Sequence, residues 1–153
     1  MSRASAVVLG LDVGDARIGL ARGERGSSFV FPRGALQRTG TSHDVERLAE
    51  LVEEEAAGEV VVGLPLNLDG TESAQTAKVR AFSEALERRL RPLGVSLVLE
   101  DERLTTRIAQ RQVGAGPLPR GKRQVKGRLD EASAVLILES YLSRQRNDEG
   151  PAR

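Results

Sequence analysis

Three short apolar segments follow one another at the start of this 153-residue chain, and they constrain its fold more than any other feature. Residues 6–13 (AVVLGLDV) and 17–22 (RIGLAR) are separated only by GDA at 14–16, so they predict the two antiparallel strands of a hairpin. Residues 27–32 (SSFVFP) predict a third antiparallel strand, closed by its proline. A sheet that begins in this way needs further elements to cover its faces.

The hydrophobic period changes in the next segment. Residues 41–58 carry apolar side chains at helical spacing, with Thr41 and Asp44 resembling a capping box and Gly58 placed as a C-cap. Residues 59–65 (EVVVGLP) form a continuous apolar run, as is typical of a buried parallel strand. The same patterns predict, in order, a helix at 72–90, a strand at 94–100, a short helix at 105–113 and a final helix at 128–146.

This order of elements predicts an α/β fold. Three antiparallel strands followed by strand–helix alternation give a mixed five-stranded sheet flanked by helices. The length fits a single domain spanning residues 1–153. Within it, residues 114–127 (GAGPLPRGKRQVKG) predict a mobile basic loop, and residues 147–153 predict a disordered tail.

Composition excludes several classes of site. Cysteine is absent and His43 is the only histidine, which excludes disulfides, thiolate zinc sites and histidine clusters. No signal peptide or membrane-length apolar run is evident, so we expect a cytoplasmic protein with no membrane partner. Residues 101–130 carry eight Lys or Arg against three acids. That basic segment could face a polyanion or form a solvated surface.

Carboxylates occupy comparable positions in this layout. Asp12 ends the first predicted strand, Glu100, Asp101 and Glu102 end the last, and Asp130 falls in the first turn of the final helix. If the first and last strands are neighbours, these groups meet at one edge of the sheet, where ligands of such sheets bind. Carboxylate ligands suit Mg²⁺ or Mn²⁺, and a pair of such ions can catalyse phosphodiester cleavage. Each acid also has an ordinary explanation as a turn residue, a surface ion-pair partner or a helix-dipole partner.

Four phrases connect these positions to a known family. GLDVGDARIGLA, VVGLPLNLDGTES, LEDERLTT and DEASAVLILESYL stand in this order and together resemble the YqgF/RuvX family over residues 7–142. The resemblance implies an RNase H-like fold, related to RuvC-type junction resolvases, and a Mg²⁺- or Mn²⁺-dependent nuclease. Its implied catalytic, metal-binding residues are Asp12, Glu102 and Asp130, with Asp101 or Glu100 in reserve beside Glu102.

The same resemblance suggests supporting residues. Gly14 would let the backbone turn beside the metals, and Thr105 would cap the helix that follows it. Arg103 could contact phosphates or hold a neighbouring carboxylate, and Asn67 and Asp69 could contact substrate or shape a turn. The basic residues expected to contact nucleic acid are Arg17, Arg103, Arg107, Arg120, Lys122, Arg123 and Lys126.

Two substrates follow from the family resemblance: the 5′ end of precursor 16S rRNA, and four-way DNA (Holliday) junctions. Symmetric cutting of a junction needs two active sites, so it also predicts a homodimer. One alternative is a non-catalytic nucleic-acid-binding module on the same fold, which would lose one of the three acids. Another is an ATP-binding member of the ribonuclease-H/actin-like group, for which the chain is short.

Overall fold

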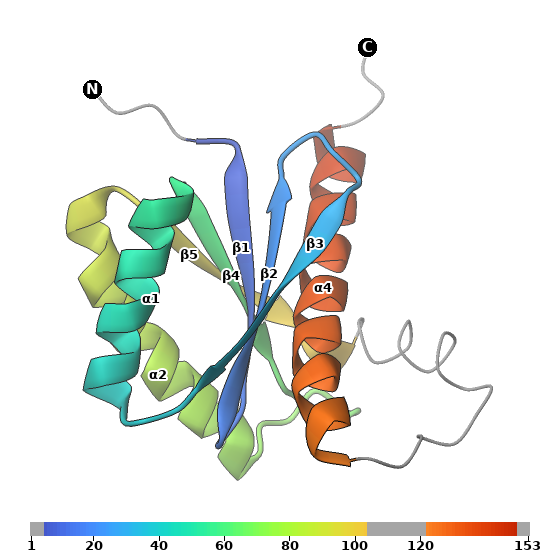
Figure 1. The fold of residues 1–153 in the computed structure, drawn as a ribbon. Helices are drawn as coiled ribbons and strands as arrows, with labels where there is room; N and C mark the ends of the chain where they lie inside the picture. The colour runs from blue at the N-terminus through green and yellow to red at the C-terminus, as the bar shows by residue number, and fades with distance from the viewer. Residues whose placement is uncertain (1–4, 104–121, 150–153) are drawn as a thin grey trace.

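The fold is a mixed five-stranded sheet with helices on both faces (Figure 1). The computed structural model describes residues 5–103 and 122–149. The strands lie in the order β3-β2-β1-β4-β5, with α1 and α2 on one face of the sheet and α4 on the other. The elements are β1 (Val7–Val13), β2 (Arg17–Glu24), β3 (Val30–Gln37), α1 (Thr41–Glu55), β4 (Glu59–Leu64), α2 (Ala74–Leu90), the short 3₁₀ helix η1 (Arg91–Leu93), β5 (Ser96–Asp101) and α4 (Lys122–Glu149).

Strand directions confirm the mixed sheet that the sequence predicts. β2 pairs antiparallel with both β1 and β3, whereas β4 pairs parallel with both β1 and β5. The carboxyl ends of β1, β4 and β5 therefore lie at one edge of the sheet, which we call the carboxyl edge. Ligands in α/β sheets bind at this kind of edge.

Two apolar cores, one on each face of the sheet, hold the layers together. Aliphatic residues of α1, α2 and the strands form the larger core, and residues of α4 with Val8, Ala21 and Val61 form the smaller one. Residues two apart along a strand face the same side. Val8, Gly10 and Asp12 of β1 consequently face α4.

The third strand is displaced from its predicted position. It runs from Val30 to Gln37 instead of covering residues 27–32, so the prediction that a proline closes it is wrong. Pro32 lies inside β3 and pairs with Ala21, next to a register shift. An edge strand tolerates proline because its outward N–H groups need no partner within the sheet.

Both predicted caps of α1 are wrong. The N-cap is Gly40, a residue without a side chain that could accept a hydrogen bond from the helix N-terminus. Asp44 instead reaches back from inside the helix to accept hydrogen bonds from the backbone N–H groups of Thr39 (3.0 Å) and Gly40 (3.3 Å). The helix ends at Glu55, with Ala56 in the left-handed conformation, before the chain reaches Gly58.

Helix α4 is longer than predicted. It begins at Lys122, so the loop prediction is wrong over residues 122–127, and it runs to Glu149, so the tail prediction is wrong over 147–149. Lys, Arg and Gln are good helix formers, which allows the helix to begin before its apolar stripe. Asp130 therefore does not lie in the first turn, contrary to the prediction. The predicted helix at 105–113 lies outside the described residues.

Within the described part of the chain, no helix is long and apolar enough to cross a membrane.

Candidate active site

Glycines bring α4 into direct contact with the backbone of the sheet. A Cβ atom added to Gly10 would lie 2.9 Å from Leu138 Cβ, and one added to Gly19 would lie 2.0 Å from the Asp130 carbonyl oxygen. Real Cβ contacts are not this short, so neither position has room for a side chain while α4 stays in place. The close approach of α4 to β1 and β2 therefore fixes the position of Asp130, the first acidic residue of the helix.

Asp12 and Asp130 meet across this contact. Asp12 pairs directly with Gly19 between β1 and β2, and the α4 backbone at Asp130 rests on Gly19. Burial of the Asp12 carboxyl, with the nearby Asp130 charge as a second cause, raises the pKa of Asp12 to about 6. A carboxyl group that is buried and faces a like charge holds its proton more tightly. These two predicted site residues are therefore electrostatic neighbours.

Glu102 reaches the same place from the end of β5, beyond β4, on the same face of the sheet as Asp12. The condition that the first and last strands are neighbours is wrong, because β4 lies between β1 and β5. Gly63 of β4 removes the obstacle: a Cβ there would lie 2.7 Å from Glu102 Oε2, so the glutamate side chain occupies that space. Burial, then the charges of Asp12 and Asp101, raise the pKa of Glu102 to about 7.

The three acids at the end of β5, Glu100, Asp101 and Glu102, have different surroundings. Glu100 is fully buried and accepts hydrogen bonds from Ser140 Oγ (2.9 Å) and Arg144, both on α4. Asp101 instead forms an ion pair with Arg103, with 2.7 Å between Oδ2 and NH2, and the pair lowers the pKa of Asp101. Glu102, in contrast, lies close enough to Asp12 for the charge of Asp12 to raise its pKa, in addition to the effect of burial.

Arg17 completes the group at the start of β2. Its Nε lies 2.6 Å from Asp130 Oδ2, and both side chains are partly exposed. The turn before it is closed by a hydrogen bond from the Gly14 N–H to the Arg17 carbonyl oxygen (2.8 Å). A Cβ at Gly14 would lie 3.1 Å from that oxygen, so glycine suits the tight turn.

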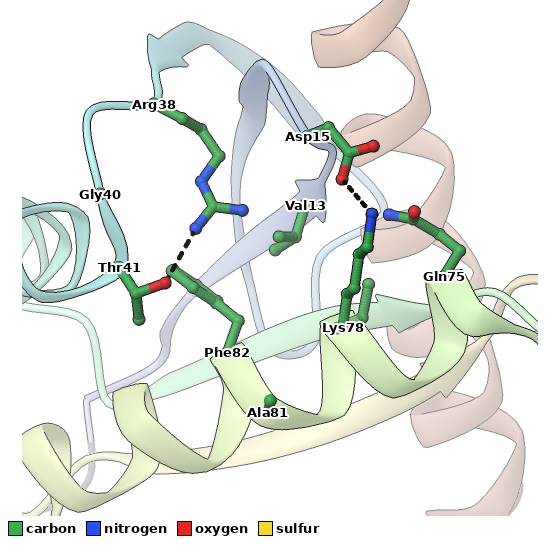
Figure 2. A pocket seen from close by; sticks show the side chains of 10 residues that line it. Val13, Asp15, Arg38, Gly40, Thr41, Gln75, Lys78, Ala81 and Phe82 are labelled. Carbon is green, nitrogen blue, oxygen red and sulfur yellow. Dashed lines mark hydrogen bonds and ion pairs between the residues drawn. The ribbon is translucent and has the colours of Figure 1, made fainter.

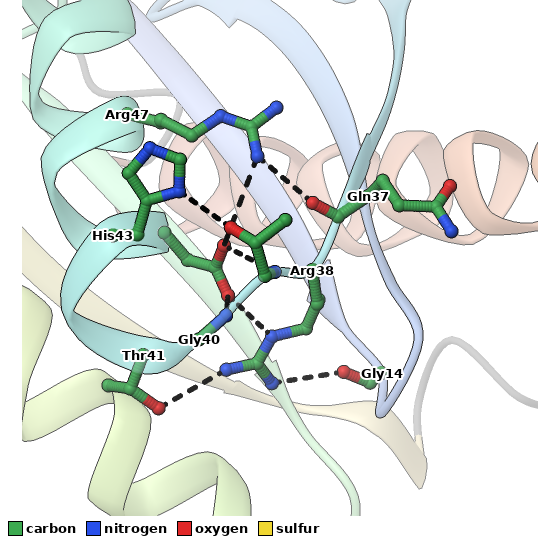
Figure 3. Close-up of polar contacts among 9 residues, drawn as sticks. Gly14, Gln37, Arg38, Gly40, Thr41, His43 and Arg47 are labelled. Atoms are coloured by element: carbon green, nitrogen blue, oxygen red, sulfur yellow. Dashed lines mark hydrogen bonds and ion pairs between the residues drawn. The ribbon is translucent and has the colours of Figure 1, made fainter.

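The sequence reasoning missed Arg38, which fixes the other side of the same turn (Figure 3). Arg38 donates hydrogen bonds to the Gly14 carbonyl oxygen (3.1 Å) and to Asp44 Oδ2 (3.0 Å). Asp44 is fully buried, which alone would raise its pKa, but hydrogen bonds from the Thr39 N–H, from Arg38 and from the Gly40 N–H hold that pKa below its usual range. The only signal in the sequence is an acid near the start of an amphipathic helix. His43 is exposed and contacts Thr39 Oγ1 (2.6 Å).

Other predicted residues have structural partners or lie outside the description. Asn67 Nδ2 donates to Thr71 Oγ1 (2.9 Å), and Asp69 accepts from the Thr71 N–H (3.0 Å), so both shape a turn. Arg103 holds the neighbouring carboxylate, as one of its two predicted roles required. Three predicted residues lie outside the described part of the chain, and three more have only their backbone described, on α4: Thr105, Arg107 and Arg120, and then Lys122, Arg123 and Lys126.

The donor chemistry of Asp12, Glu102 and Asp130 fits a hard cation. All three are carboxylates, and the pKa of Asp12 and of Glu102 is raised mainly by burial and in addition by repulsion from neighbouring acids, which a bound cation would relieve. Within residues 5–103 and 122–149, no three acidic or histidine side chains are already arranged tightly enough to hold a metal ion. The ion pair between Arg17 and Asp130 holds one of the three acids in another contact.

The raised pKa of Glu102 gives a testable pH dependence. The unfolded chain loses this proton near pH 4.5 and the folded protein near pH 7, so the folded state binds more protons in between. The contribution of Glu102 to the free energy of unfolding therefore falls as the pH rises from about 4 to about 7. We expect Glu102→Gln to match the wild type at pH 4 and to be more stable by about 1–2 kcal/mol at pH 8. Thermal unfolding in EDTA across this pH range measures the difference. A constant difference at all pH values would contradict the assigned burial.

Comparisons with known proteins agree with this architecture. A family model described as "RuvX: Holliday junction resolvase" matches residues 6–144. A Thermus thermophilus protein named "Putative pre-16S rRNA nuclease" is 48% identical over 134 residues, covering 88% of this chain and 95% of its own. A Maridesulfovibrio salexigens protein of the same name is 39% identical over 137 residues, covering 90% and 98%.

Solved structures share the fold at low sequence identity. T. thermophilus RuvC in complex with a Holliday junction substrate superposes with a TM-score of 0.62 at 13% identity, covering 92% of this chain and 95% of its own. The yeast mitochondrial Holliday junction resolvase Ydc2 gives a TM-score of 0.59 at 11% identity, covering 95% and 81%. These likenesses confirm the predicted RNase H-like fold.

Proposed function

Because this chain belongs to the RuvX family, we propose that it is a divalent-metal-dependent nuclease that hydrolyses phosphodiesters in structured nucleic acid. Asp12, Glu102 and Asp130 are its proposed catalytic residues and metal ligands. The alternative of a non-catalytic binding module is disfavoured, since all three acids are retained and neighbouring acids add to the effect of burial on the raised pKa values of Asp12 and Glu102.

One observation carries the proposal: three separate elements contribute carboxylates that influence one another at the carboxyl edge. The end of β1, the residue after β5 and helix α4 supply them, and glycines at positions 19 and 63 make the approach sterically feasible. Buried like charges are costly to hold together. Carboxylates that are held together despite this cost, with raised pKa values, are typical of catalytic sites.

Mg²⁺ or Mn²⁺ held by these residues would activate a water molecule and stabilise the leaving oxygen of the phosphodiester. Asp12, at the end of β1, would hold the metal together with Glu102 and Asp130, whose charges both interact with its own. Arg17, which forms an ion pair with Asp130, is placed to contact a substrate phosphate and to keep Asp130 oriented.

The flanking phosphates need a basic surface. Arg103 lies beside the carboxylates, at the end of β5, and could contact phosphate while it holds Asp101. The predicted contacts from Arg107, Arg120, Lys122, Arg123 and Lys126 would extend this surface along the chain. Such contacts give affinity that falls steeply with salt.

For the substrate, we propose either the 5′ region of precursor 16S rRNA or a four-way DNA junction, with the protein acting in the cytoplasm. The curated relatives carry the name of an rRNA nuclease, and the matching family model carries the name of a junction resolvase. Paired cleavage of a junction would require a homodimer, whereas trimming of an RNA end would not.

A cleavage assay separates these outcomes. Purified protein with Mg²⁺ or Mn²⁺ would be given a labelled four-way junction, a linear duplex of the same sequence and an RNA that carries the precursor 5′ region. We expect cleavage of one structured substrate and none of the linear duplex. Paired symmetric nicks would identify a resolvase, and RNA trimming alone would identify a maturation nuclease. Absence of cleavage in all three would support the binding-module alternative.

A further inference from the structure

A cavity of about 560 Å³ lies behind the candidate active site, on the opposite face of the sheet (Figure 2). It is bounded by the turn between β1 and β2, the start of α1 and the first half of α2. Its volume is in the range of pockets that hold small organic ligands, about 300–1,000 Å³. Nothing in the proposed cleavage chemistry uses it.

The cavity and the carboxylates share the end of β1. Asp12 faces α4, whereas Val13, the next residue, faces the other side and lines the cavity. Asp15, at the tip of the turn, also lines it and forms an ion pair with Lys78 of α2, with 3.5 Å between the charged atoms. A nucleic-acid strand bound along the carboxyl edge would therefore pass from the carboxylates over the turn to the mouth of the cavity.

The lining combines an apolar wall with polar groups. Val13, Val79, Ala81 and Phe82 supply the apolar part. Arg38 lies over the Phe82 ring, with its guanidinium carbon 4.8 Å from the ring centre, and hydrogen bonds to Asp44 and Gly14 hold it in place. Nucleobases stack on arginine planes and on apolar side chains when they are unpaired.

Two further side chains supply the polar groups that a nucleotide requires. Gln75 is only partly exposed, lines the cavity, and makes no side-chain hydrogen bond within the described residues. An amide group of this kind can read the edge of a base, because it both donates and accepts. Lys78 is well exposed and joined to Asp15 only by a surface ion pair, which is worth little and can be exchanged for a phosphate.

We propose that this cavity binds one unpaired nucleotide of the substrate, next to the phosphodiester that is cleaved. The inference rests on the proposed nuclease function and adds a basis for substrate choice. A base can enter the cavity only if it has left its stack, which is least costly at a branch point, a bulge or a single-stranded end. Continuous duplex would be bound at its phosphates alone and would be a poor substrate.

A substitution that fills the cavity with a larger side chain tests the proposal. Ala81→Phe places a ring in the cavity from an exposed position of α2, so the fold is expected to be kept. Ala77→Phe is the matched control, because Ala77 is also exposed on α2 but does not line the cavity. We expect Ala81→Phe to lose about tenfold in affinity for a substrate with an unpaired nucleotide and to keep its affinity for continuous duplex. Equal affinities for Ala81→Phe, Ala77→Phe and wild type would overturn the proposal.

Crosslinking locates the nucleotide directly. A photoreactive base placed beside the cleavage site should crosslink to the α2 peptide that contains Gln75 and Lys78, and Ala81→Phe should abolish this product. Free AMP and ATP are tested as competitors in the same assay. A free nucleotide that binds with Ala81-dependent affinity, while nucleic acid does not crosslink there, would contradict the proposal and identify a small-molecule site.

These outcomes are distinguishable from failure of the proposed nuclease function. Binding and crosslinking need no cleavage, so they can support the cavity assignment even in a protein that cuts nothing. Conversely, a protein that cuts its substrate at the wild-type rate in the Ala81→Phe form keeps the nuclease assignment and loses the cavity one.

Discussion

Replacing Asp12 by Asn is expected to lower the cleavage rate by about 100- to 1,000-fold while leaving the affinity for nucleic acid within about twofold of wild type. Asn keeps the shape of Asp12 but removes the charge with which it would hold a divalent cation. The phosphate contacts expected to dominate affinity are assigned by the proposal to other residues. Rate under single-turnover conditions and affinity from a binding titration are measured separately. Glu24→Gln, an exposed carboxylate at the far end of β2, is the control and should cleave normally.

The same variant has a second expected effect, on stability. Asp12 is held with a pKa of about 6, mainly by burial, so the ionised form destabilises the folded protein above that pH. Asp12→Asn should therefore raise the free energy of unfolding at pH 8 by about 1–2 kcal/mol in EDTA. A variant that is inactive and destabilised would show that Asp12 acts as a structural residue. A variant that cleaves normally would remove it from the site.

Gly19→Ala is the second substitution for which we expect a large effect. It would change the packing of α4 on the sheet and leave the charge of the site unaltered. Its Cβ would lie 2.0 Å from the Asp130 carbonyl oxygen, which belongs to the helix backbone and cannot rotate away. Helix α4 would have to lift from the sheet, at a cost of about 3 kcal/mol in stability. Asp130 would move with it, and a displacement of about 1 Å is enough to reduce catalysis by about 100-fold.

Gly26→Ala provides the contrast. Gly26 has φ of 83°, but a Cβ there would meet nothing within 4 Å. We expect a cost of about 1 kcal/mol from backbone strain and no change in cleavage rate. Denaturant unfolding and single-turnover cleavage of both variants give the comparison. If the two alanine variants behaved alike, close packing at Gly19 would not be what places Asp130.

The sheet could be predicted from the sequence because its signals are local. Alternating or continuous apolar runs separated by tight turns identify β1, β2 and β4 within a residue or two. The end of β3 could not be predicted from the sequence, because its exposed residues carry no apolar pattern and an edge strand accepts Pro32. The start of α4 could not be predicted from the sequence either, since residues 122–128 (KRQVKGR) include a glycine and carry no apolar pattern of helical spacing.

The family phrases predict site residues, but no local pattern predicts the geometry that brings them together. Family phrases pointed to Asp12, Glu102 and Asp130. The route by which Glu102 reaches Asp12 depends on Gly63 in an intervening strand, which nothing in the local sequence around either acid reveals. Alternation along β5 could have separated Asp101 from its neighbours, because Val98, Glu100 and Glu102 share the face that α4 covers. Arg38 acts through backbone contacts with a distant turn, for which no sequence pattern exists.

The packing of α4 also sets the order in which the site can form during synthesis. The partners Arg17 and Asp130 are 113 residues apart in sequence, and Glu100 and Ser140 are 40 apart. The sheet with α1 and α2 can assemble as the ribosome releases it, whereas the face with Gly10 and Gly19 stays uncovered until α4 arrives. Contacts between such distant residues form late in folding, since the intervening chain must first be closed into a loop. A partly made chain therefore carries Asp12 without Asp130, and the proposed nuclease centre would be completed only when α4 docks.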